Sequence, residues 1–487
     1  MSAPNVTVNK NTFTTVSAPN NPTGILAIAA CSSSGTVNQP KGFSRSDLAV
    51  NQFGQGPLVE FNAIVLPIGG NPTVLCKGTT TFAGSYNGLQ STSTGSVVST
   101  SGNPYDHYAI FGTVVNGGTV GVAGITIQFT DQNGTPIGGL QSLGTATSLA
   151  VPNTGATFAF TASTLKTGDT FSVNTERPMM GDTDLIAALT ALSKSRLPFE
   201  GVLADSSCTV STVGLVDTFL SGLEAKGQFK FVLLNSRMKT EAPSAEDEGT
   251  YLTALTTLFG NQTSIRVCVG ADGGHSASQI SGISGKRPTS LYLAARAMAI
   301  PLGEDPAYVA NNVLSGVNVT DSNGNPLDHD EDVNPGLDAN RFVTLRTFAP
   351  GGPQGVYITN ANTMQPSGGN FPYLQHIRIA NRACQIAWYV LTTQLSRGVR
   401  KNLKPDPVTG AVYIFEQDAA AIETLVNDAI NQALKGQVNA VQFKLSRTDD
   451  LSVTPVTLNG TLSIQALAYV KGYVVSQQFV KALTTTV

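Results

Sequence analysis

The spacing of apolar positions changes along the chain, and residues 181–271 show this most clearly. Apolar runs of strand length alternate there with stretches whose apolar residues recur every three or four positions. Strands that alternate with helices build layered folds, so the region predicts an α/β layer with parallel or mixed strands. The predicted helices cover 182–194, 210–227 and 244–260, and the predicted strands cover 199–205, 228–235 and 264–271.

Residues with capping preferences mark the ends of these helices. Asp182 or Thr183 is expected to cap the first helix, and Gly227 and Gly260 follow the last periodic positions of the second and third. The carboxylates of 246–248 fall in the first turn of the third helix, where the helix dipole favours negative charge. This position explains them without acid–base work.

Before this layer, the chain predicts a polar arm in which Val6 and Val8 alternate weakly with polar residues. The elements expected after it are a buried strand at 24–31, a short helix at 44–54 with Ser46 as a possible N-cap, a helix or strand from 60, and a strand near 73–76.

Residues 78–165 have a different pattern. Short apolar runs are separated by turn signals at Asn116 and Gln132, and Asp106 and Asp131 are the charged residues of the stretch. Several short strands at this spacing indicate an all-β sandwich or barrel. Because it interrupts a helical pattern, it is interpreted as an inserted domain.

Helical spacing returns after residue 286, and the chain ends in a strand pattern. Between 461 and 480 β-branched and aromatic residues are dense, and Leu462 and Ile464 alternate with polar positions. The strand raises the question of what it pairs with. The other elements expected here are helices at 287–299, 372–397 and 418–436 and strands at 341–348 and 355–360.

Together these patterns predict a multidomain α/β (α+β) protein with a mixed-sheet body, an inserted all-β domain and extended strand arms at both ends. A chain of 487 residues is too long for one core. The expected divisions are an N-terminal arm at 1–21, the body at 22–77, the β-rich insertion at 78–177, an α/β section at 178–285, a C-terminal body at 286–460 and a C-terminal arm at 461–487.

The fraction of charged residues is unusually low. Charged residues make up 13% of the chain, against ~25% in typical globular proteins. The net charge of -3 offers no basic field for nucleic acid. A surface poor in charge is weakly protected against self-association, which suggests that neighbours cover much of it. A neutral, Thr/Gly-rich surface of a secreted β protein is the alternative.

The cysteines and the apolar runs exclude several classes of site. Cys31, Cys76, Cys208, Cys268 and Cys384 are far apart and form no CxxC pair, which fits buried, reduced thiols. No apolar run has the length of a membrane helix. Residues 24–31 imitate a lipoprotein cleavage box, but their apolar core is short and the segment before it is polar, so a buried strand is the better interpretation.

Motifs for catalysis or cofactor binding fail on inspection. Residues 270–286 end in Gly-Lys, yet Arg287 follows where a phosphate-binding loop needs Ser or Thr, and Ile280 replaces its first Gly. No G-x-S-x-G elbow occurs. The histidines lack a recognisable nucleophile partner and are expected to be satisfied or solvated: His107, His275, His329 and His376. We therefore expect no enzyme activity and no cofactor.

Two charged stretches each have a functional and a purely structural interpretation. Asp321, Asn323 and Asn325 have the spacing of a calcium loop, but Pro326 occupies the place of the turn Gly and Asp332 that of the bidentate Glu, so a solvated turn and no metal site is expected. The basic cluster after the long helix either compensates its dipole or contacts an acidic partner surface. Its members are Arg397, Arg400, Lys401 and Lys404.

Four stretches in a fixed order resemble the conserved body of contractile phage tail sheath proteins. They are RPTSLYLAARAMAIPLGEDPAYV, ANRFVTLRTFAPGGPQGVYITNANTM, FPYLQHIRIANRACQIAWYVLTTQLSRGVRKN and IFEQDAAAIETLVNDAINQAL. Residues 24–54 are also similar to the opening strand and helix of that family. The likeness is most specific from 286 to 435 and is one of order and texture, because sheath proteins lack a short diagnostic motif.

The resemblance implies a structural subunit of hexameric discs that stack helically around a tail tube protein, with baseplate and tail terminator proteins as further partners. It places the chain in a virion tail assembled in the host cytoplasm, without nucleic-acid binding or membrane insertion. Sheath arms add strands to sheets of adjacent subunits, which would answer the question of the final strand. The implied inter-subunit residues are Val6, Val8, Leu462, Ile464, Val470 and Val474, and the implied tube-facing charge is the basic cluster.

Two rival hypotheses predict other features. A secreted adhesive or carbohydrate-binding β-rich protein would need a cleavable signal and exposed aromatics, whereas the one Trp, Trp388, lies in an apparent helix stripe. A nucleotide-using enzyme would need the phosphate loop that fails above. The sheath interpretation requires neither.

Overall fold

A six-stranded sheet forms the centre of the molecule in the computed structural model, which describes residues 23–239, 246–278, 280–311, 313–319, 336–348, 353–366, 368–469 and 471. The strand order is β16-β15-β14-β1-β3-β2, parallel except for β2 at one edge. The bounds are β1 Leu26–Ala30, β2 Lys41–Phe43, β3 Thr73–Lys77, β14 Gly201–Ala204, β15 Phe231–Asn235 and β16 Val267–Gly270. Except for the exposed edge strand β2, apolar runs form these strands because helices bury both faces of the sheet.

Alternate residues of β1 show the two faces of the sheet. Leu26 and Ile28 face the core shared with one group of helices, and Ala27 and Ala29 face the core shared with the other. The first group is α1 Ser46–Phe53, α2 Pro57–Gly69 and α6 Thr289–Ala299, and the second is α3 Asp182–Lys194, α4 Thr212–Glu224 and α5 Glu248–Phe259. The predicted mixed α/β character is confirmed.

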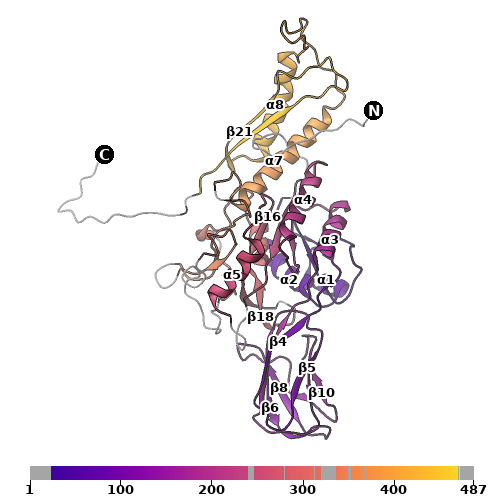
Figure 1. Ribbon diagram of the computed structural model, residues 1–487, viewed down its shortest axis with the longest axis vertical. Helices are drawn as coiled ribbons and strands as arrows, with labels where there is room; N and C mark the ends of the chain where they lie inside the picture. The colour runs from indigo at the N-terminus through magenta and orange to yellow at the C-terminus, as the bar shows by residue number, and fades with distance from the viewer. Residues whose placement is uncertain are drawn as a thin grey trace, which may run out of the picture.

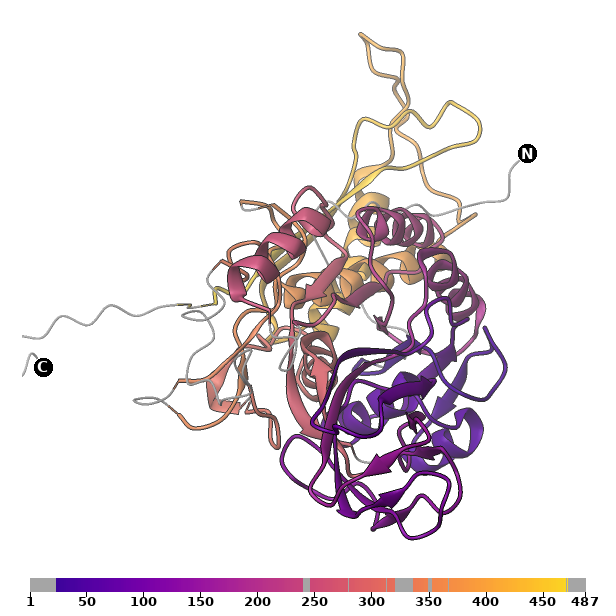
Figure 2. The same cartoon turned by 60° about the horizontal axis from the view of Figure 1, so that its bottom comes forward.

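The β-rich segment forms one end of the long axis, and the other end carries α7, α8 and β21 (Figure 1). Its five-stranded sheet has the order β4-β13-β6-β8-β9 and packs with the sheet β10-β11-β5 around Phe129, Phe158 and Phe171. Figure 2 brings this end forward. The bounds are β4 Ser85–Ser91, β5 Val98–Gly102, β6 Ala109–Asn116, β7 Gly118–Thr119, β8 Thr126–Thr130, β9 Gln141–Ser142, β10 Ser148–Ala150, β11 Ala156–Phe160, β12 Thr164–Leu165 and β13 Thr170–Glu176.

The opposite end has its own core, in which α7 and α8 pack on a two-stranded antiparallel sheet, β21–β22. The bounds here are α7 Leu374–Thr393, α8 Glu416–Ala433, β21 Val438–Leu445 and β22 Gly460–Ala466. The remaining elements are β17 Gly273–Ala277, β18 Ser284–Pro288, the 3-10 helix Val309–Asn311, β19 Leu345–Arg346 and β20 Tyr357–Ile358. Eight α-helices occur in the described part of the chain, and none combines the length and apolar character that a membrane crossing requires.

Three predicted details of the helices are wrong. The N-cap of α1 is Arg45 and not Ser46. The N-cap of α3 is Gly181, because Asp182 instead accepts hydrogen bonds from the hydroxyls of Thr209 (2.7 Å) and Thr212 (2.6 Å). The helix predicted to reach residue 397 ends at Thr393, and Ser396 adopts a left-handed φ of 62° that no helix can contain.

The cysteines are free thiols, as predicted. Burial raises the pKa of Cys31, Cys76 and Cys208 to about 12. Thiols with such pKa values are not nucleophiles at neutral pH. The domain boundaries inferred from sequence stay predictions.

Candidate functional site

The carboxyl ends of the parallel strands are the usual ligand site of an open α/β sheet. Asp205 follows β14 and Asn235 ends β15 at this edge. Arg177 donates to the carboxylate of Asp205 from Nε (2.9 Å) and lies 2.9 Å from it through Nη2, and Asn235 Nδ2 donates to it at 2.8 Å. Both partners of the ion pair are buried. Side chains of the same chain therefore take up the hydrogen-bonding capacity of the Asp205 carboxylate.

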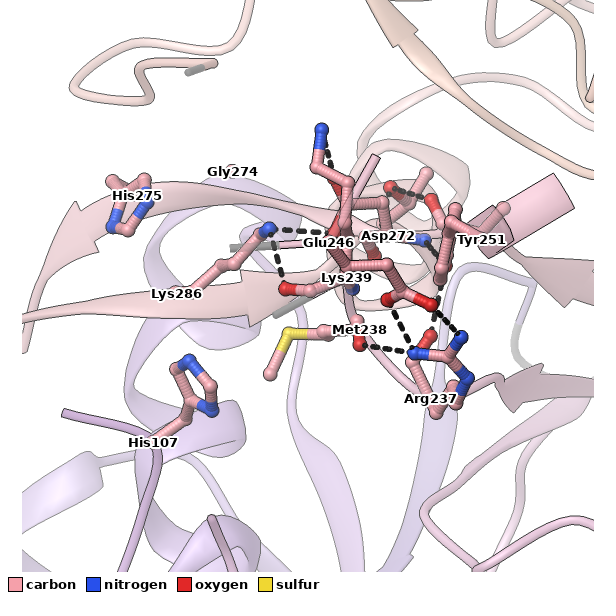
Figure 3. Close-up of polar contacts among 12 residues, drawn as sticks. His107, Arg237, Met238, Lys239, Glu246, Tyr251, Asp272, Gly274, His275 and Lys286 are labelled. Carbon is pink, nitrogen blue, oxygen red and sulfur yellow. Dashed lines mark hydrogen bonds and ion pairs between the residues drawn. The ribbon is translucent and has the colours of Figure 1, made fainter. Parts of the chain in front are cut away.

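A second buried set of charges, drawn in Figure 3, fills the edge beyond β15 and β16. Lys286 Nζ lies 2.6 Å from Asp272 Oδ1 and donates to the carbonyl of Lys239 at 3.2 Å. Lys239 is paired with Glu248. Lys286 is the lysine of the failed phosphate-loop motif. It lies on β18, in a hairpin with β17, and faces a carboxylate in place of a phosphate.

The carboxylates of 246–248 do more than occupy a helix N-terminus. Asp247 is the N-cap of α5 and accepts from the amide of Thr250 at 2.9 Å. Glu246 accepts from Arg237 Nη1 at 2.8 Å, and Glu248 pairs with Lys239. The first turn of α5 is thereby fastened to the segment after β15, in addition to the dipole effect that the sequence indicated.

A third group joins the β-rich segment to the body. Arg287 on β18 is fully buried, 3.2 Å from Asp106 Oδ2 and 4.0 Å from Glu60 Oε2 on α2. Burial lowers the pKa of Arg287, but the charges of Asp106 and Glu60 outweigh it and the pKa is raised. Burial raises the pKa of Glu60. One cation thus ties two carboxylates from distant parts of the chain.

Two histidines belong to the same joint. His107 Nδ1 lies 3.2 Å from Glu176 Oε2, and His275 Nδ1 lies 2.5 Å from Gln132 Nε2. Burial would raise the pKa of Glu176, but the charge and hydrogen bond of His107 hold it below its usual value. These rings have partners, as predicted. Within the described residues no group of three His, Cys, Asp or Glu side chains could hold a metal ion.

The start of the C-terminal arm is fixed to the body at two residues. The hydroxyl of Tyr469 donates to the carbonyl of Gly303 at 2.7 Å, and Lys471 Nζ lies 2.5 Å from Asp305 Oδ2. His376 on α7 packs against the ring of Tyr469, with centroids 5.5 Å apart. These contacts hold residues 469 and 471 against the body.

Acid is expected to weaken this attachment through His376. Burial lowers its pKa below the usual 6.5, Asp305 opposes this and Lys471 adds to it. The unfolded chain therefore binds the proton first, and stability is lost as pH falls through 6.5 toward the folded pKa. Melting temperatures measured from pH 7.5 to 5 should fall less steeply for His376→Gln than for the wild type. Equal slopes would contradict the assignment.

The backbone of β22 presents hydrogen-bonding groups away from β21. Asn427 on α8 binds both backbone groups of Phe443, accepting from its N–H at 2.8 Å and donating to its C=O at 3.2 Å. The N–H and C=O of Phe443 therefore point away from β22, so Phe443 and Leu462 form a non-hydrogen-bonded pair of the antiparallel ladder. In such a pair both residues direct their backbone groups outward, and the N–H and C=O of Leu462 point away from β21. Ile464, opposite Val441, has the same orientation.

The two edges of this ribbon therefore differ. The edge of β21 is capped by Asn427 and by Glu423, which accepts from the amide of Leu445 at 2.7 Å. Within the described residues β22 pairs with β21 alone. Leu462 and Ile464 thus belong to an intrachain hairpin, and the outer edge of β22 is the place where a further strand could add. Val6, Val8, Val470 and Val474 lie outside the described residues, as do the calcium-like stretch from 321 and His329.

The basic cluster is only partly available to a partner. Arg400 is paired with Asp418 at the start of α8 (2.6 Å), and Lys401 Nζ donates to the carbonyl of Leu451 at 2.6 Å. Arg397 Nη1 donates to Gln394 Oε1 at 2.8 Å. All four side chains are exposed. Arg400 thus binds a carboxylate in the first turn of α8. It does not compensate the dipole of α7, which was one of the two interpretations of the basic cluster.

Sequence reasoning missed the buried charge pairs. An acidic residue soon after a buried strand was a usable signal for them: Asp205 directly follows β14, and Asp272 is the second residue after β16. The cationic partner is Arg177 for Asp205 and Lys286 for Asp272, and no local pattern points to either pairing.

No protein-family model matches this sequence, and no curated protein matches it significantly. Among solved structures, the chain is similar to the sheath tail protein of Listeria innocua (11% identity, 91% of this chain and 96% of that one, TM-score 0.43). It is similar to the sheath tail protein of Desulfitobacterium hafniense (11% identity, 95% and 100%, TM-score 0.41). A third similar structure is the PVC sheath complex, in its contracted state, of an extracellular contractile injection system (11% identity, 99% and 98%, TM-score 0.48).

Proposed function

We propose that the chain is the structural subunit of a contractile tail sheath, which polymerises helically around a tail tube and contracts to drive the tube through a host envelope. The sequence resemblance between residues 286 and 435 supports the family. The observation that carries the proposal is the outer edge of β22, where Leu462 and Ile464 direct backbone groups away from β21. A strand edge without a partner strand is a template for a strand from another chain.

Strand addition between copies suits a lattice that must rearrange. A head-to-tail contact whose rotation does not close builds an open helical filament. Arms that stay paired can keep subunits attached while rigid bodies change their packing. If contraction buries a few hundred Å² more apolar surface per subunit, about 25 cal/mol per Å² gives several kcal/mol before ordering costs. No nucleotide or cofactor is needed, and we propose no enzymatic step.

Blocking the outer edge of β22 should prevent polymerisation without unfolding the subunit. In Ile464→Pro the lost N–H is one that points away from β21, so the intrachain hairpin keeps its bonds while an incoming strand loses a donor. We expect folded subunits by circular dichroism and no tubes by negative-stain electron microscopy.

Val441→Pro is the matched control, because Val441 lies opposite Ile464 on the other edge of the same ribbon. Tubes from Val441→Pro but none from Ile464→Pro identify β22 as the receiving edge. The reverse result would show that the incoming strand uses β21.

The tube side of the subunit is assigned to the end that carries α7 and α8. The β-rich segment lies at the opposite end of the long axis and would face outward (Figure 1). Neutralising Arg397, Arg400, Lys401 and Lys404 together should reduce cosedimentation of subunits with tubes of the tail tube protein at low salt, because exposed charges are screened as salt rises. Arg45→Gln, which changes an exposed arginine at the N-cap of α1, is the control. Unchanged cosedimentation of the fourfold variant would remove the tube-facing assignment.

A further inference from the structure

The exposed surface of the β-rich segment carries almost no formal charge. Residues 78–165 contain two charged side chains, and both are buried: Asp106 is 1% exposed and Asp131 is 2% exposed. Lys166 and Asp169 follow at a turn, where Asp169 Oδ2 accepts from the amide of Lys166 at 2.9 Å. The rest of the outward face is made of Thr, Ser, Asn, Gln, Gly and apolar residues.

The two buried carboxylates are used where the segment meets the body. Asp106 faces Arg287, and Asp131 Oδ2 accepts from the amide of Ser284 at 3.1 Å, both on β18. The two buried carboxylates of this segment therefore fasten it to the body. Its free surface differs from an ordinary soluble surface, which carries roughly 25–35% charged residues.

Large apolar side chains are exposed on this uncharged surface. On β6 the alternation places Phe111, Thr113 and Val115 on the outer face of the five-stranded sheet, with Phe111 39% and Val115 41% exposed. Their cross-strand neighbours are uncharged too, since Ser172 and Thr130 flank Phe111. The other exposed apolar side chains of the segment are Phe82, Leu89, Val97, Val122 and Leu140.

We propose that this surface is a contact between copies, in which the β-rich segment of one subunit meets the β-rich segment of a second. A charged partner such as nucleic acid or an anionic membrane would have to lose the hydration of its charges against a face that offers no counter-charge. Two uncharged faces that meet do not have to remove water from charged groups. The inference rests on the proposed function, because polymerisation is what brings many copies of this segment close together.

The test compares charge with neutrality at the same positions. Phe111→Lys with Val115→Lys puts two like charges on the outer face, and Phe111→Gln with Val115→Gln removes the same apolar groups without charge. Tubes of each variant are dissociated in urea and followed by sedimentation at 50 mM and 1 M salt. We expect the lysine tubes to dissociate at lower urea than the glutamine tubes, with a smaller difference at 1 M salt.

Three other outcomes would contradict the contact between β-rich segments, and the third would contradict the sheath function as well. Lysine and glutamine tubes with the same urea midpoint would overturn the contact and leave the sheath function standing. Wild-type binding to dextran, a neutral polysaccharide, that the lysine variant loses would overturn it in favour of a glycan surface. Failure of the wild-type chain to form any tube would overturn the sheath function itself, and the contact with it.

Discussion

Removal of residues 472–487 is expected to give a folded, soluble subunit that forms no tubes. The cut falls after Lys471, so the attachment of Tyr469 to Gly303 and of Lys471 to Asp305 is retained. Under the sheath proposal the removed residues supply a strand to another copy, and without it the lattice loses its connection. Negative-stain microscopy and sedimentation measure assembly, and circular dichroism and the melting temperature measure folding.

A longer deletion shows why the position of the cut matters. Deletion from residue 461, which the sequence alone would suggest, also removes β22 and uncovers the core beneath Leu462. It should lower the melting temperature as well as abolish assembly, so loss of tubes would have two explanations. Tubes of normal length from the 472–487 deletion would contradict the arm model.

Arg287→Met is expected to be the most destabilising single substitution at the joint. It leaves Asp106 and Glu60 buried without their cation, and breaking a buried ion pair in this way costs about 3–5 kcal/mol. Urea unfolding followed by circular dichroism measures the free energy of unfolding. Arg45→Met is the surface control, because the pair of Arg45 with Asp47 is exposed and exposed ion pairs contribute little to stability.

A triple variant separates lost charge balance from lost packing. Arg287→Met combined with Asp106→Leu and Glu60→Leu removes all three charges, and apolar replacements of buried ion groups are often neutral. It should recover much of the stability that Arg287→Met loses. If Arg287→Met is no more destabilising than Arg45→Met, the joint does not depend on this cation.

The central sheet could be predicted because both of its faces are buried. The strands that became β1, β14, β15 and β16 read as continuous apolar runs, which a sheet covered by helices requires. The β17–β18 hairpin could not be predicted in the same way. Its sequences GGHSA and SGKRP have no apolar alternation, and their burial comes from ion pairs and from the β-rich segment packed beside them.

The site was harder to predict than the fold for a similar reason. The alternation of Leu462 and Ile464 revealed a strand, but it could not show that one edge pairs with β21 within the chain. Nor could the basic cluster reveal that Arg400 pairs with Asp418, because the long connection between α7 and α8 folds back on itself and brings them together. Local patterns report faces and periods, whereas partners depend on the path of the chain.

The position of β1 in the middle of the sheet constrains how the polypeptide is made. Its neighbours are β3, which follows soon after, and β14, which the ribosome produces only after the whole β-rich segment. One side of β1 must therefore wait unpaired during synthesis, while the β-rich segment, which has a core of its own, can already fold. A fragment that ends at residue 200 should have a protease-sensitive N-terminal portion attached to a resistant β-rich one.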